Sequence, residues 1–528
     1  MKPASSHPRL ISRLLLLCGL GVSPMAMGGV TVITHGLNGT TTGWVTGMAN
    51  AIASHASGKA ANAPIYKLTV SNTAGTLTTS ASKVSGGDPR TIATGEIIVL
   101  IDWGAVADGN SFNTAQVAAA VAPDFTTTNF IPELGGHALV EWPLHFIGHS
   151  RGGSLVCELS RLLGTQGIWV DHVTTLDAHP LNNDGFNDFI YSAHDATARI
   201  YENVLFADSC YQNASLLING EPVPGASWRK QSTFSGGYTD TLSGNHSDVH
   251  LWYHGTIDWN IPTSDTEASL TGSERQTWWT AAESMGTNSG FCYSLLGGSN
   301  RLSLLQPNGA NSSPVRDGFN QKYDLGAGMA NNRTDLSTNS GEWPNVIRLD
   351  LTTPNPIASG GIATLQIYYQ WAVPVSETQT VQVYLDDDAN PRNGNERLAL
   401  TGTASGTTDS QVGSGTIAVP LDPFSVPAGA YAVFVKVTGA GQSRILYAPE
   451  FLRVVPDMTP PTLDLAAGTQ GTLTLGVNGA AGQTVVIEDS VDLREWQAFW
   501  TNQLPTTRWE MPFGPAGSNQ FFRARLLP

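Results

Sequence analysis

The sequence predicts an α/β domain followed by two all-β domains. Apolar, strand-like segments alternate with helical patterns up to about residue 210, whereas short β-branched segments separated by turn residues dominate from residue 343 onward. Alternating strands and helices favour a mainly parallel sheet with helices on both faces, and regularly spaced short strands are typical of β-sandwiches. A chain of 528 residues is also too long for a single core, so several domains are expected.

The composition narrows the classes of partner. The formal net charge is −16, and only 27 residues are Lys or Arg. Affinity for nucleic acid depends on clustered basic residues that neutralise phosphates. We therefore expect no nucleic-acid partner.

The N-terminus has the pattern of a secretory signal peptide. Basic residues precede the apolar run 14–22, and small residues follow it. This run is too short to span a bilayer as a helix. We expect residues 1–28 to be a signal peptide, the mature chain to begin near Gly28 or Gly29, and the protein to be secreted or held at the cell surface.

The first domain is expected to span residues 29–310, with 311–342 as a linker or as a tail of this domain. Its predicted strands are apolar and rich in β-branched residues, and they cover residues 29–34, 96–104, 143–147, 173–176 and 200–207. Helical patterns cover residues 115–121, 155–163 and 246–254.

A serine between two glycines stands where the strand at 143–147 passes into the helical pattern at 155–163. Residues 148–152 read Gly-His-Ser-Arg-Gly. A nucleophilic serine held in a sharp strand-to-helix turn requires neighbours without a Cβ, because the backbone passes close to them. The spacing therefore predicts that Ser150 is a nucleophile.

The first predicted strand ends in a glycine-rich loop, His35-Gly36-Leu37-Asn38-Gly39. Acyl transfer at a serine needs two backbone N–H groups aimed at the developing oxyanion. One comes from the residue after the nucleophile and one from a loop of this kind. We predict Arg151 and Leu37 as these donors.

A base for the serine is expected among the histidines of residues 244–255. His246 is the choice because it lies where a loop passes into a helix, whereas His250 and His254 are expected to pack beneath it or to face solvent. Histidines four residues apart also fit a zinc site. That alternative lacks the glutamate that follows the first histidine of the helical protease motif, and it leaves Ser150 without a role.

Two aspartates compete for the role of the acid that orients the base. Asp177 and Asp208 each follow a predicted apolar strand, and both lie between Ser150 and His246 in the chain. The order Ser, Asp, His is the one found in hydrolases with this serine turn. The residues alone leave both acids open.

Three segments together resemble the pancreatic-lipase-like branch of the α/β-hydrolase superfamily. They are residues 101–104 (Ile-Asp-Trp-Gly), 145–150 (His-Phe-Ile-Gly-His-Ser) and 175–178 (Thr-Leu-Asp-Ala). The acid of that branch follows the strand after the nucleophile strand, which implies Asp177 rather than Asp208. Its catalytic histidine precedes an aromatic pair, which implies His246.

The resemblance implies a secreted serine hydrolase, lipase-like or esterase-like, that cleaves carboxylic esters of a small molecule or a lipid. The reaction would pass through an acyl-enzyme and require no cofactor. Two residues depart from the family: Arg151 stands where leucine is usual, and Ala178 where proline is usual. Two alternatives stay open, namely an amidase or peptidase with the same triad, and a surface-binding protein whose hydrolase domain is inactive.

The C-terminal half is predicted to hold two β domains. Residues 343–456 fit an Ig-like β-sandwich, and a proline-containing stretch separates them from a small all-β module at 462–528. The last module resembles terminal modules of secreted bacterial multidomain proteins. That resemblance implies attachment to a cell surface or a polymer.

One loop of the sandwich concentrates oxygen ligands of the kind that calcium prefers. They are Asp386, Asp388, Asn390 and Glu396. Their register does not fit an EF-hand. A plain hairpin turn is the simpler interpretation, and a calcium site is the alternative.

Overall fold

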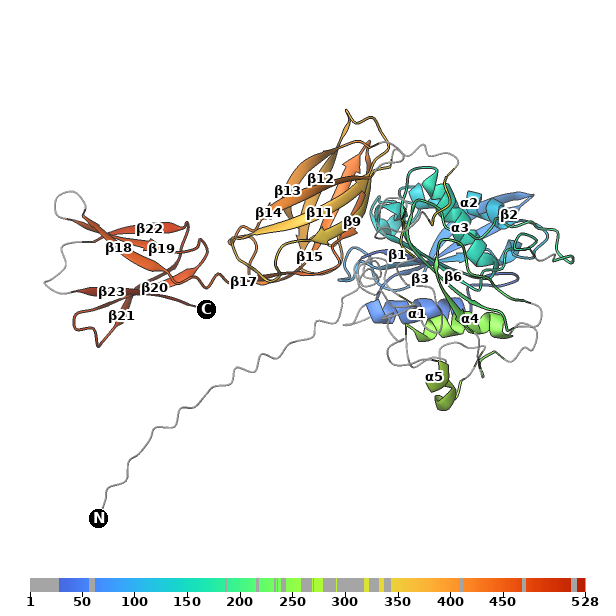
Figure 1. Cartoon of the computed structure of the whole chain (residues 1–528), viewed down its shortest axis with the longest axis horizontal. Helices are drawn as coiled ribbons and strands as arrows, with labels where there is room; N and C mark the ends of the chain where they lie inside the picture. Colours follow the sequence, from blue (N-terminus) through green and yellow to red (C-terminus); the bar gives the residue numbers. More distant parts are fainter. Residues whose placement is uncertain are drawn as a thin grey trace, which may run out of the picture.

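The computed structural model forms three parts in a row: an N-terminal domain around a large sheet, a β-sandwich and a small β module (Figure 1). The predicted signal peptide lies outside the described residues, except for Gly28. Within the ranges described, no helix is long and apolar enough to cross a membrane. The structure describes residues 28–56, 62–185, 188–214, 218–231, 234, 236–238, 244–257, 268, 270–278, 291, 318–321, 332–336, 343–407, 412–467, 472–513 and 520–527.

The N-terminal domain is built on an eight-stranded mixed sheet. In spatial order its strands are β3, β2, β4, β1, β5, β6, β7 and β8. Every neighbouring pair is parallel except the edge hairpin of β2 and β3. The strands are β1 (Val30–Thr34), β2 (Ile65–Thr73), β3 (Thr76–Ser85), β4 (Ile97–Asp102), β5 (Leu144–His149), β6 (Val170–Leu176), β7 (Val204–Gln212) and β8 (Ser227–Gln231).

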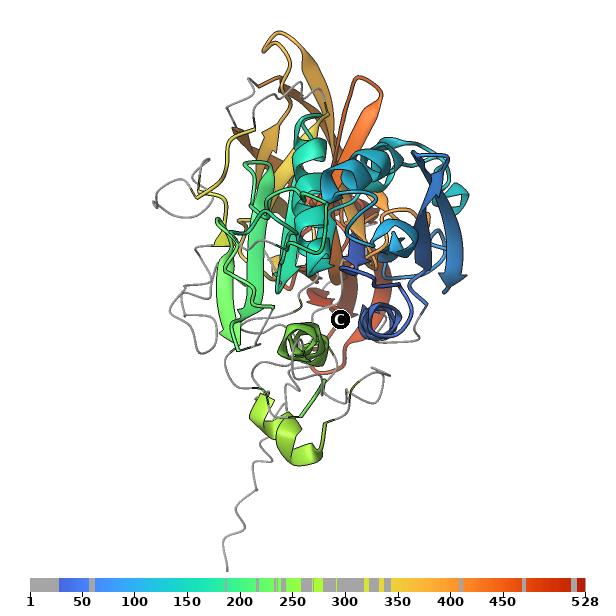
Figure 2. The same cartoon turned by 90° about the vertical axis from the view of Figure 1, so that its right-hand side faces the viewer.

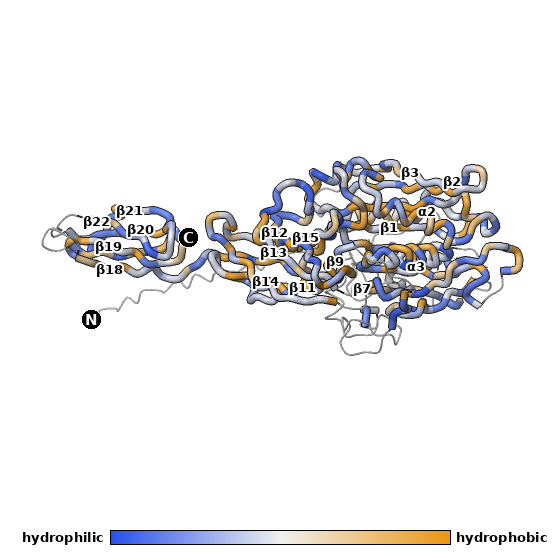
Figure 3. The backbone as a smooth tube through the Cα atoms, turned by 90° about the horizontal axis from the view of Figure 1, so that it is seen from above, coloured by the Kyte–Doolittle hydropathy of each residue, from blue (hydrophilic) through white to orange (hydrophobic). Residues whose placement is uncertain are grey.

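Helices cover both faces of this sheet, with α2 and α3 on one side and α1 and α4 on the other (Figure 1). Val32 packs in the core with α2 and α3, whereas the next residue, Ile33, packs with α1 and α4. Figure 3 shows the apolar stretches of α2 and α3. The helices are α1 (Trp44–Ala56), α2 (Thr114–Thr126), α3 (Arg151–Gly164), α4 (Gly244–Gly255) and α5 (Gly272–Trp278), with 3₁₀ turns at Gly104–Val106, Pro132–Leu134 and Leu139–Glu141.

Strand β7 differs from its prediction. It runs to Gln212, so Asp208 lies inside the strand and does not follow its end. Asp208 and Ser209 are both buried, although their polarity resembles the end of a strand in the sequence. The prediction that Asp208 ends a strand is therefore wrong.

Parts of the segment 311–342 lie against this domain. Residues 318–321 and 332–336 pack beside β7, with isolated bridges from Phe319 to Phe206 and from Thr334 to Tyr201. The buried Arg333 donates to the backbone carbonyl of Val204 at 3.1 Å. The described parts of this segment thus favour the tail over the linker.

The sandwich consists of two sheets that share one apolar core. One sheet follows the order β10, β17, β15, β12, β13, with β16 added beside β15, and the other follows β14, β11, β9. The strands are β9 (Asn345–Leu351), β10 (Ile357–Ala358), β11 (Ile362–Gln370), β12 (Thr378–Asp386), β13 (Arg397–Ser405), β14 (Gly413–Pro420), β15 (Gly429–Gly439), β16 (Gln442–Tyr447) and β17 (Leu452–Val455).

The C-terminal module pairs two three-stranded sheets, ordered β18, β19, β22 and β21, β20, β23. A small core that includes Leu475 and Ile487 lies between them. The strands are β18 (Thr462–Ala467), β19 (Leu473–Asn478), β20 (Thr484–Ser490), β21 (Gln497–Gln503), β22 (Arg508–Phe513) and β23 (Phe521–Leu526).

The sandwich packs against the N-terminal domain at the amino ends of β5 and β6, and it lies behind that domain in Figure 2. Arg444 and Asp171 form a buried ion pair of 2.5 Å across the contact, and the same Asp171 oxygen accepts the backbone N–H of Leu144 at 2.7 Å. The indole N–H of Trp169 donates to Gln370 at 2.6 Å. Buried polar contacts thus join the two domains.

The oxygen-rich loop of the sandwich also takes part in this contact. The Asn390 side-chain amide donates to the carbonyl of Pro89 at 2.7 Å, and Arg392 pairs with Glu141 at 2.7 Å. Asp388 accepts the side-chain amides of Asn393 and Asn395. Residues 386–396 therefore join β12 and β13 as a hairpin loop that also docks on the N-terminal domain. The described residues hold no group of three His, Cys, Asp or Glu side chains that could bind a metal ion.

Candidate active site

Ser150 occupies a strained turn between β5 and α3. Its φ is 58° and its ψ is −127°, a region that non-glycine residues populate rarely and at a cost of about 1–3 kcal/mol. A Cβ at Gly148 would lie 2.1 Å from the carbonyl oxygen of Gly152, and one at Gly152 would lie 2.6 Å from that of His35. Both glycines are therefore steric requirements of this turn.

Gly36 brings the loop after β1 against the side chain of Ser150. A Cβ added at Gly36 would lie 2.5 Å from Ser150 Cβ and 2.8 Å from its Oγ. Trp103 supports this loop, because its indole N–H donates to the carbonyl of His35 at 3.1 Å and its ring stacks on the imidazole. Leu37, the predicted oxyanion donor, follows Gly36 directly in the sequence.

Asp177 and His246 are in direct contact. Nδ1 of His246 lies 2.6 Å from Oδ2 of Asp177, whose side chain is fully buried. Gln212, the last residue of β7, donates to both carboxylate oxygens at 2.8 Å, through its backbone N–H and its side-chain amide. These contacts fix the carboxylate and turn Nε2 of the imidazole away from it.

The turn at Ser150 is tied to both of these residues through its neighbours. Ser150 N–H donates to the carbonyl of Leu176, the residue before Asp177, at 3.0 Å. His149 donates from Nε2 to the backbone carbonyl of His246 at 3.0 Å. The structure thus brings Ser150, Asp177 and His246 to the same carboxyl edge of the sheet.

Asp208 lies away from this edge. It pairs in register with Thr174, two residues before the end of β6, and accepts its hydroxyl at 2.6 Å. Its Oδ1 also lies 2.9 Å from Nε2 of His172. The structure therefore places Asp177, and not Asp208, against His246.

The other histidines of α4 are buried. His250 stacks on Trp44 with ring centroids 4.2 Å apart, and His254 is fully buried. Burial lowers the pKa of His250 and His149 well below the ordinary value and thereby favours the neutral form of both rings. No zinc-type cluster of three ligands occurs among the residues that the structure describes.

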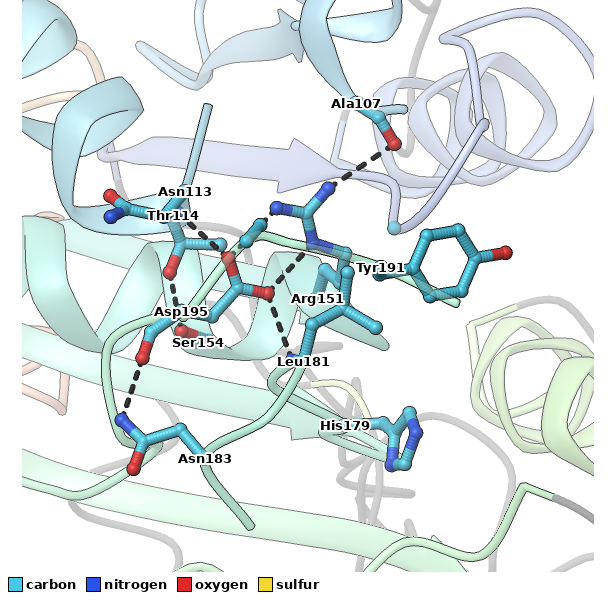
Figure 4. A network of polar contacts seen from close by, with 12 residues as sticks. Ala107, Asn113, Thr114, Arg151, Ser154, His179, Leu181, Asn183, Tyr191 and Asp195 are labelled. Carbon is cyan, nitrogen blue, oxygen red and sulfur yellow. Dashed lines mark hydrogen bonds and ion pairs between the residues drawn. The ribbon is translucent and has the colours of Figure 1, made fainter. Parts of the chain in front are cut away.

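The side chain of Arg151 is buried beneath the turn, whereas the sequence singled out only its backbone (Figure 4). Its guanidinium forms a bidentate pair with Asp195 at 2.7 and 2.8 Å and donates to the carbonyls of Ala107 and Phe112. It also lies 4.9 Å from the ring centroid of Trp103. The charge is therefore compensated inside the domain.

Three further residues at the site were not predicted from the sequence. Gln212 donates to both carboxylate oxygens of Asp177, His149 contacts the backbone of His246, and the His179 ring lies 6.4 Å from the His246 ring. Burial lowers the pKa of His179, but contacts with Asp184 and Asp188 outweigh it and the net pKa is raised. Only sequence position could have indicated the two histidines, since His149 directly precedes Ser150 and His179 follows Asp177 by two residues.

Comparisons with known proteins identify no family. No protein-family model matches the chain, and no curated protein matches it in sequence. One similar solved structure is described as "Biofilm associated protein - BSP domain". It is 17% identical, the match covers 35% of this chain and 27% of that chain, and the TM-score of 0.12 supports no inference about fold or function.

Proposed function

We propose that this protein is a serine hydrolase that cleaves carboxylic esters. Ser150 is the nucleophile, His246 the general base and then acid, and Asp177 the residue that orients His246. The observation that carries this proposal is the 2.6 Å contact between His246 and Asp177 beside a serine held at φ 58°. The strained serine turn, the glycine-rich loop and the fixed acid together are what acyl transfer requires.

Acylation follows from these positions. Oγ of Ser150 attacks the ester carbonyl while Nε2 of His246 takes its proton, and the carbonyl π electrons move onto oxygen. Backbone N–H groups of Arg151 and Leu37 stabilise that oxyanion. The tetrahedral intermediate then collapses, the C–O bond to the alcohol breaks, and His246 returns the proton to the departing oxygen, which leaves an acyl-Ser150.

Deacylation repeats these steps with water. His246 takes a proton from the water as its oxygen attacks the acyl carbon, and the oxyanion again forms beside Arg151 and Leu37. Collapse breaks the bond to Oγ, which regains its proton from His246. Asp177 stays ionised throughout and stabilises the imidazolium form of His246. No cofactor takes part in this scheme.

More broadly, we propose that the protein belongs to the α/β-hydrolase superfamily and carries accessory β domains. The parallel strand order around β5 and helices on both faces support the first assignment. An Ig-like character of the sandwich is supported by Tyr431, whose hydroxyl donates to the carbonyl of Pro427 at 2.6 Å. Export, and attachment through the last module to a cell surface or polymer, rest on the sequence patterns.

Hydrolysis of matched chromogenic substrates tests the proposal. The purified protein should hydrolyse p-nitrophenyl butyrate far faster than butyryl p-nitroanilide, and His246→Ala should lower kcat for the ester by about 10⁴-fold or more. Circular dichroism would check that the variant is folded. Absence of ester hydrolysis, or full activity in His246→Ala, would contradict the proposal, and a faster anilide would favour an amidase or peptidase.

A further inference from the structure

A loop next to the candidate site is fixed to the serine turn by one carboxylate. We call residues 180–185 and 188–196 the Asp195 loop. Asp195 accepts the Arg151 guanidinium through both oxygens and also the backbone N–H groups of Thr114 at 2.9 Å and Leu181 at 3.0 Å. Its side chain is fully buried. Asp195 therefore joins the start of α2, the start of α3 and the loop (Figure 4).

The loop is braced internally as well. Asn182 accepts the backbone N–H of Asp188 at 2.8 Å and donates to the carbonyls of Tyr191 at 3.1 Å and Ala193 at 2.9 Å. Tyr191 N–H donates to the carbonyl of Asp188 at 2.7 Å. These bonds close a turn from Asp188 to Tyr191 and fix both of its ends.

The two central residues of this turn are large, apolar and exposed. Phe189 is 85% exposed and Ile190 is 67% exposed, although the turn that presents them is held by hydrogen bonds on both sides. Burying these two apolar side chains against a ligand would be favourable, because transfer of apolar surface out of water is favourable. Such a feature beside a reaction centre is typical of a binding surface.

Both ends of the turn lie next to the candidate site. Tyr191 and Leu37 converge on Gly109, where an added Cβ would lie 2.6 Å from Tyr191 Cδ1 and 3.1 Å from Leu37 Cδ1. At the other end, Asp188 Oδ1 lies 3.6 Å from Nε2 of His179. Because Leu37 belongs to the oxyanion loop and His179 lies beside His246, the turn borders the site where the ester would bind.

We propose that the Asp195 loop is the wall of the substrate site that binds the hydrophobic chain of the ester, with Phe189 and Ile190 as its contact residues and Arg151 as the positioning residue that fixes it. This inference rests on the proposed ester hydrolysis. The hydrophobic chain of the ester can belong to its acyl part or to its alcohol part. The substrate class is therefore a long-chain ester bound as a single molecule.

The test compares long and short esters below the critical micelle concentration of each. One arm uses p-nitrophenyl decanoate against p-nitrophenyl acetate, and the other uses decyl acetate against ethyl acetate. The combined change Phe189→Ser and Ile190→Ser should lower the long-to-short ratio of kcat/KM about tenfold in one arm, mainly through KM. Phe424→Ser, at a 52% exposed position in the sandwich, is the matched control and should leave both ratios unchanged.

Asp195→Asn tests the positioning step, because it removes the charge that pairs with Arg151 and keeps the size of the side chain. In the arm that responds to the Phe189 and Ile190 changes, Asp195→Asn should also lower the long-to-short ratio of kcat/KM about tenfold. Adding Asp195→Asn to the Phe189 and Ile190 changes should not lower this ratio further, since all of these changes act through the contact between the loop and the ester chain. A purely structural role of Asp195 would lower the rates for long and short esters equally and leave the ratio in place.

The outcomes separate the two proposals. Hydrolysis of short esters by the wild type with ratios that do not move in either arm would overturn the loop assignment and leave the ester hydrolase standing. No hydrolysis of any ester by the folded wild type would overturn both. An effect of Phe189→Ser and Ile190→Ser that appears only above the critical micelle concentration would contradict binding of a single molecule and indicate contact with a lipid surface.

Discussion

The two ends of the central sheet differ in backbone strain and in the pairing of buried charges. At the carboxyl ends, Ser150 and Asp177 have positive φ values of 58° and 46°. At the amino ends, the sandwich covers the sheet, and Asp171 and Arg444 are paired and buried. One end thus holds conformations that are unfavourable on their own, and the other provides paired contacts between two domains.

This difference indicates that the two ends of the sheet have different roles. Strain at a reaction centre persists only where the surrounding structure over-determines it. At the amino ends, Asp171 binds both the start of β5 and the sandwich, and β5 is the strand that leads into Ser150. Changes at the carboxyl ends should therefore affect catalysis, whereas changes at the amino ends should affect stability.

The largest expected effect is at the carboxyl end. Ser150→Ala should lower kcat for ester hydrolysis by about 10⁶-fold, because the members of a triad act as a unit. The free energy of unfolding should change by at most about 1 kcal/mol. Steady-state kinetics and urea denaturation measure the two quantities, and a variant that keeps its activity would remove the basis of the comparison.

The two competing acids sharpen the comparison within the same sheet. Asp177→Asn should lower kcat by about 10⁴-fold, because the imidazole of His246 loses the carboxylate that orients it. Asp208→Asn should change kcat by less than about tenfold but destabilise the fold by about 1–3 kcal/mol, through weaker bonds to His172 and Thr174. The reverse pattern would show that the acid is Asp208.

The domain contact provides the next test. Arg444→Met should destabilise the protein by about 3–5 kcal/mol, because it leaves the buried Asp171 without its charge partner. Adding Asp171→Asn should recover most of this loss, since an amide oxygen still accepts the N–H of Leu144. Denaturation measures the loss of stability and the folded fraction, and kinetics on the folded fraction should give the wild-type kcat. A fall in kcat would contradict the separation of catalysis and stability between the two ends of the sheet.

A smaller effect concerns pH and Glu96, which directly precedes β4 at the amino end. Burial raises the pKa of Glu96 to about 8, against the hydrogen bond from Thr31 at 2.6 Å that favours the charged form. Between pH 5 and 8 the folded chain therefore holds a proton at Glu96 that the unfolded chain has lost, and stability should fall as pH rises, by up to about 1.4 kcal/mol per pH unit. Glu96→Gln should reduce this slope in urea titrations at several pH values. An unchanged slope would show that Glu96 is not protonated in the folded state.

Local patterns in the sequence sufficed for the serine turn, the glycine-rich loop after β1 and the helix of His246. Each depends on residues within one segment, where glycines or a periodic apolar pattern leave few alternative local conformations. The choice between Asp177 and Asp208 required a resemblance to a family, because it depends on the length of β7. In the structure His246 contacts Asp177 and not Asp208, and no local pattern indicates Gln212, which holds the Asp177 carboxylate.

The contacts between distant segments could not be predicted. Asp195 and Arg151 are 44 residues apart, and Asp171 and Arg444 are 273 apart. A charged residue in an apolar segment shows only that a partner is needed and does not say which one. The oxygen-rich loop left calcium open as an alternative to a hairpin for the same reason, since carboxylates and amides that dock one domain on another have the composition of a calcium loop.

Labelling with a fluorophosphonate tests the central claim most directly, because this reagent bonds only to a serine oxygen that is activated as a nucleophile. Mass spectrometry of the wild-type protein should find the adduct on Ser150, and Ser150→Ala should remove it. Asp177→Asn should slow the labelling strongly, whereas Asp208→Asn should not. A folded wild-type protein without an adduct on Ser150, or equal labelling of Ser150→Ala, would contradict the assignment of this sheet edge as an active site.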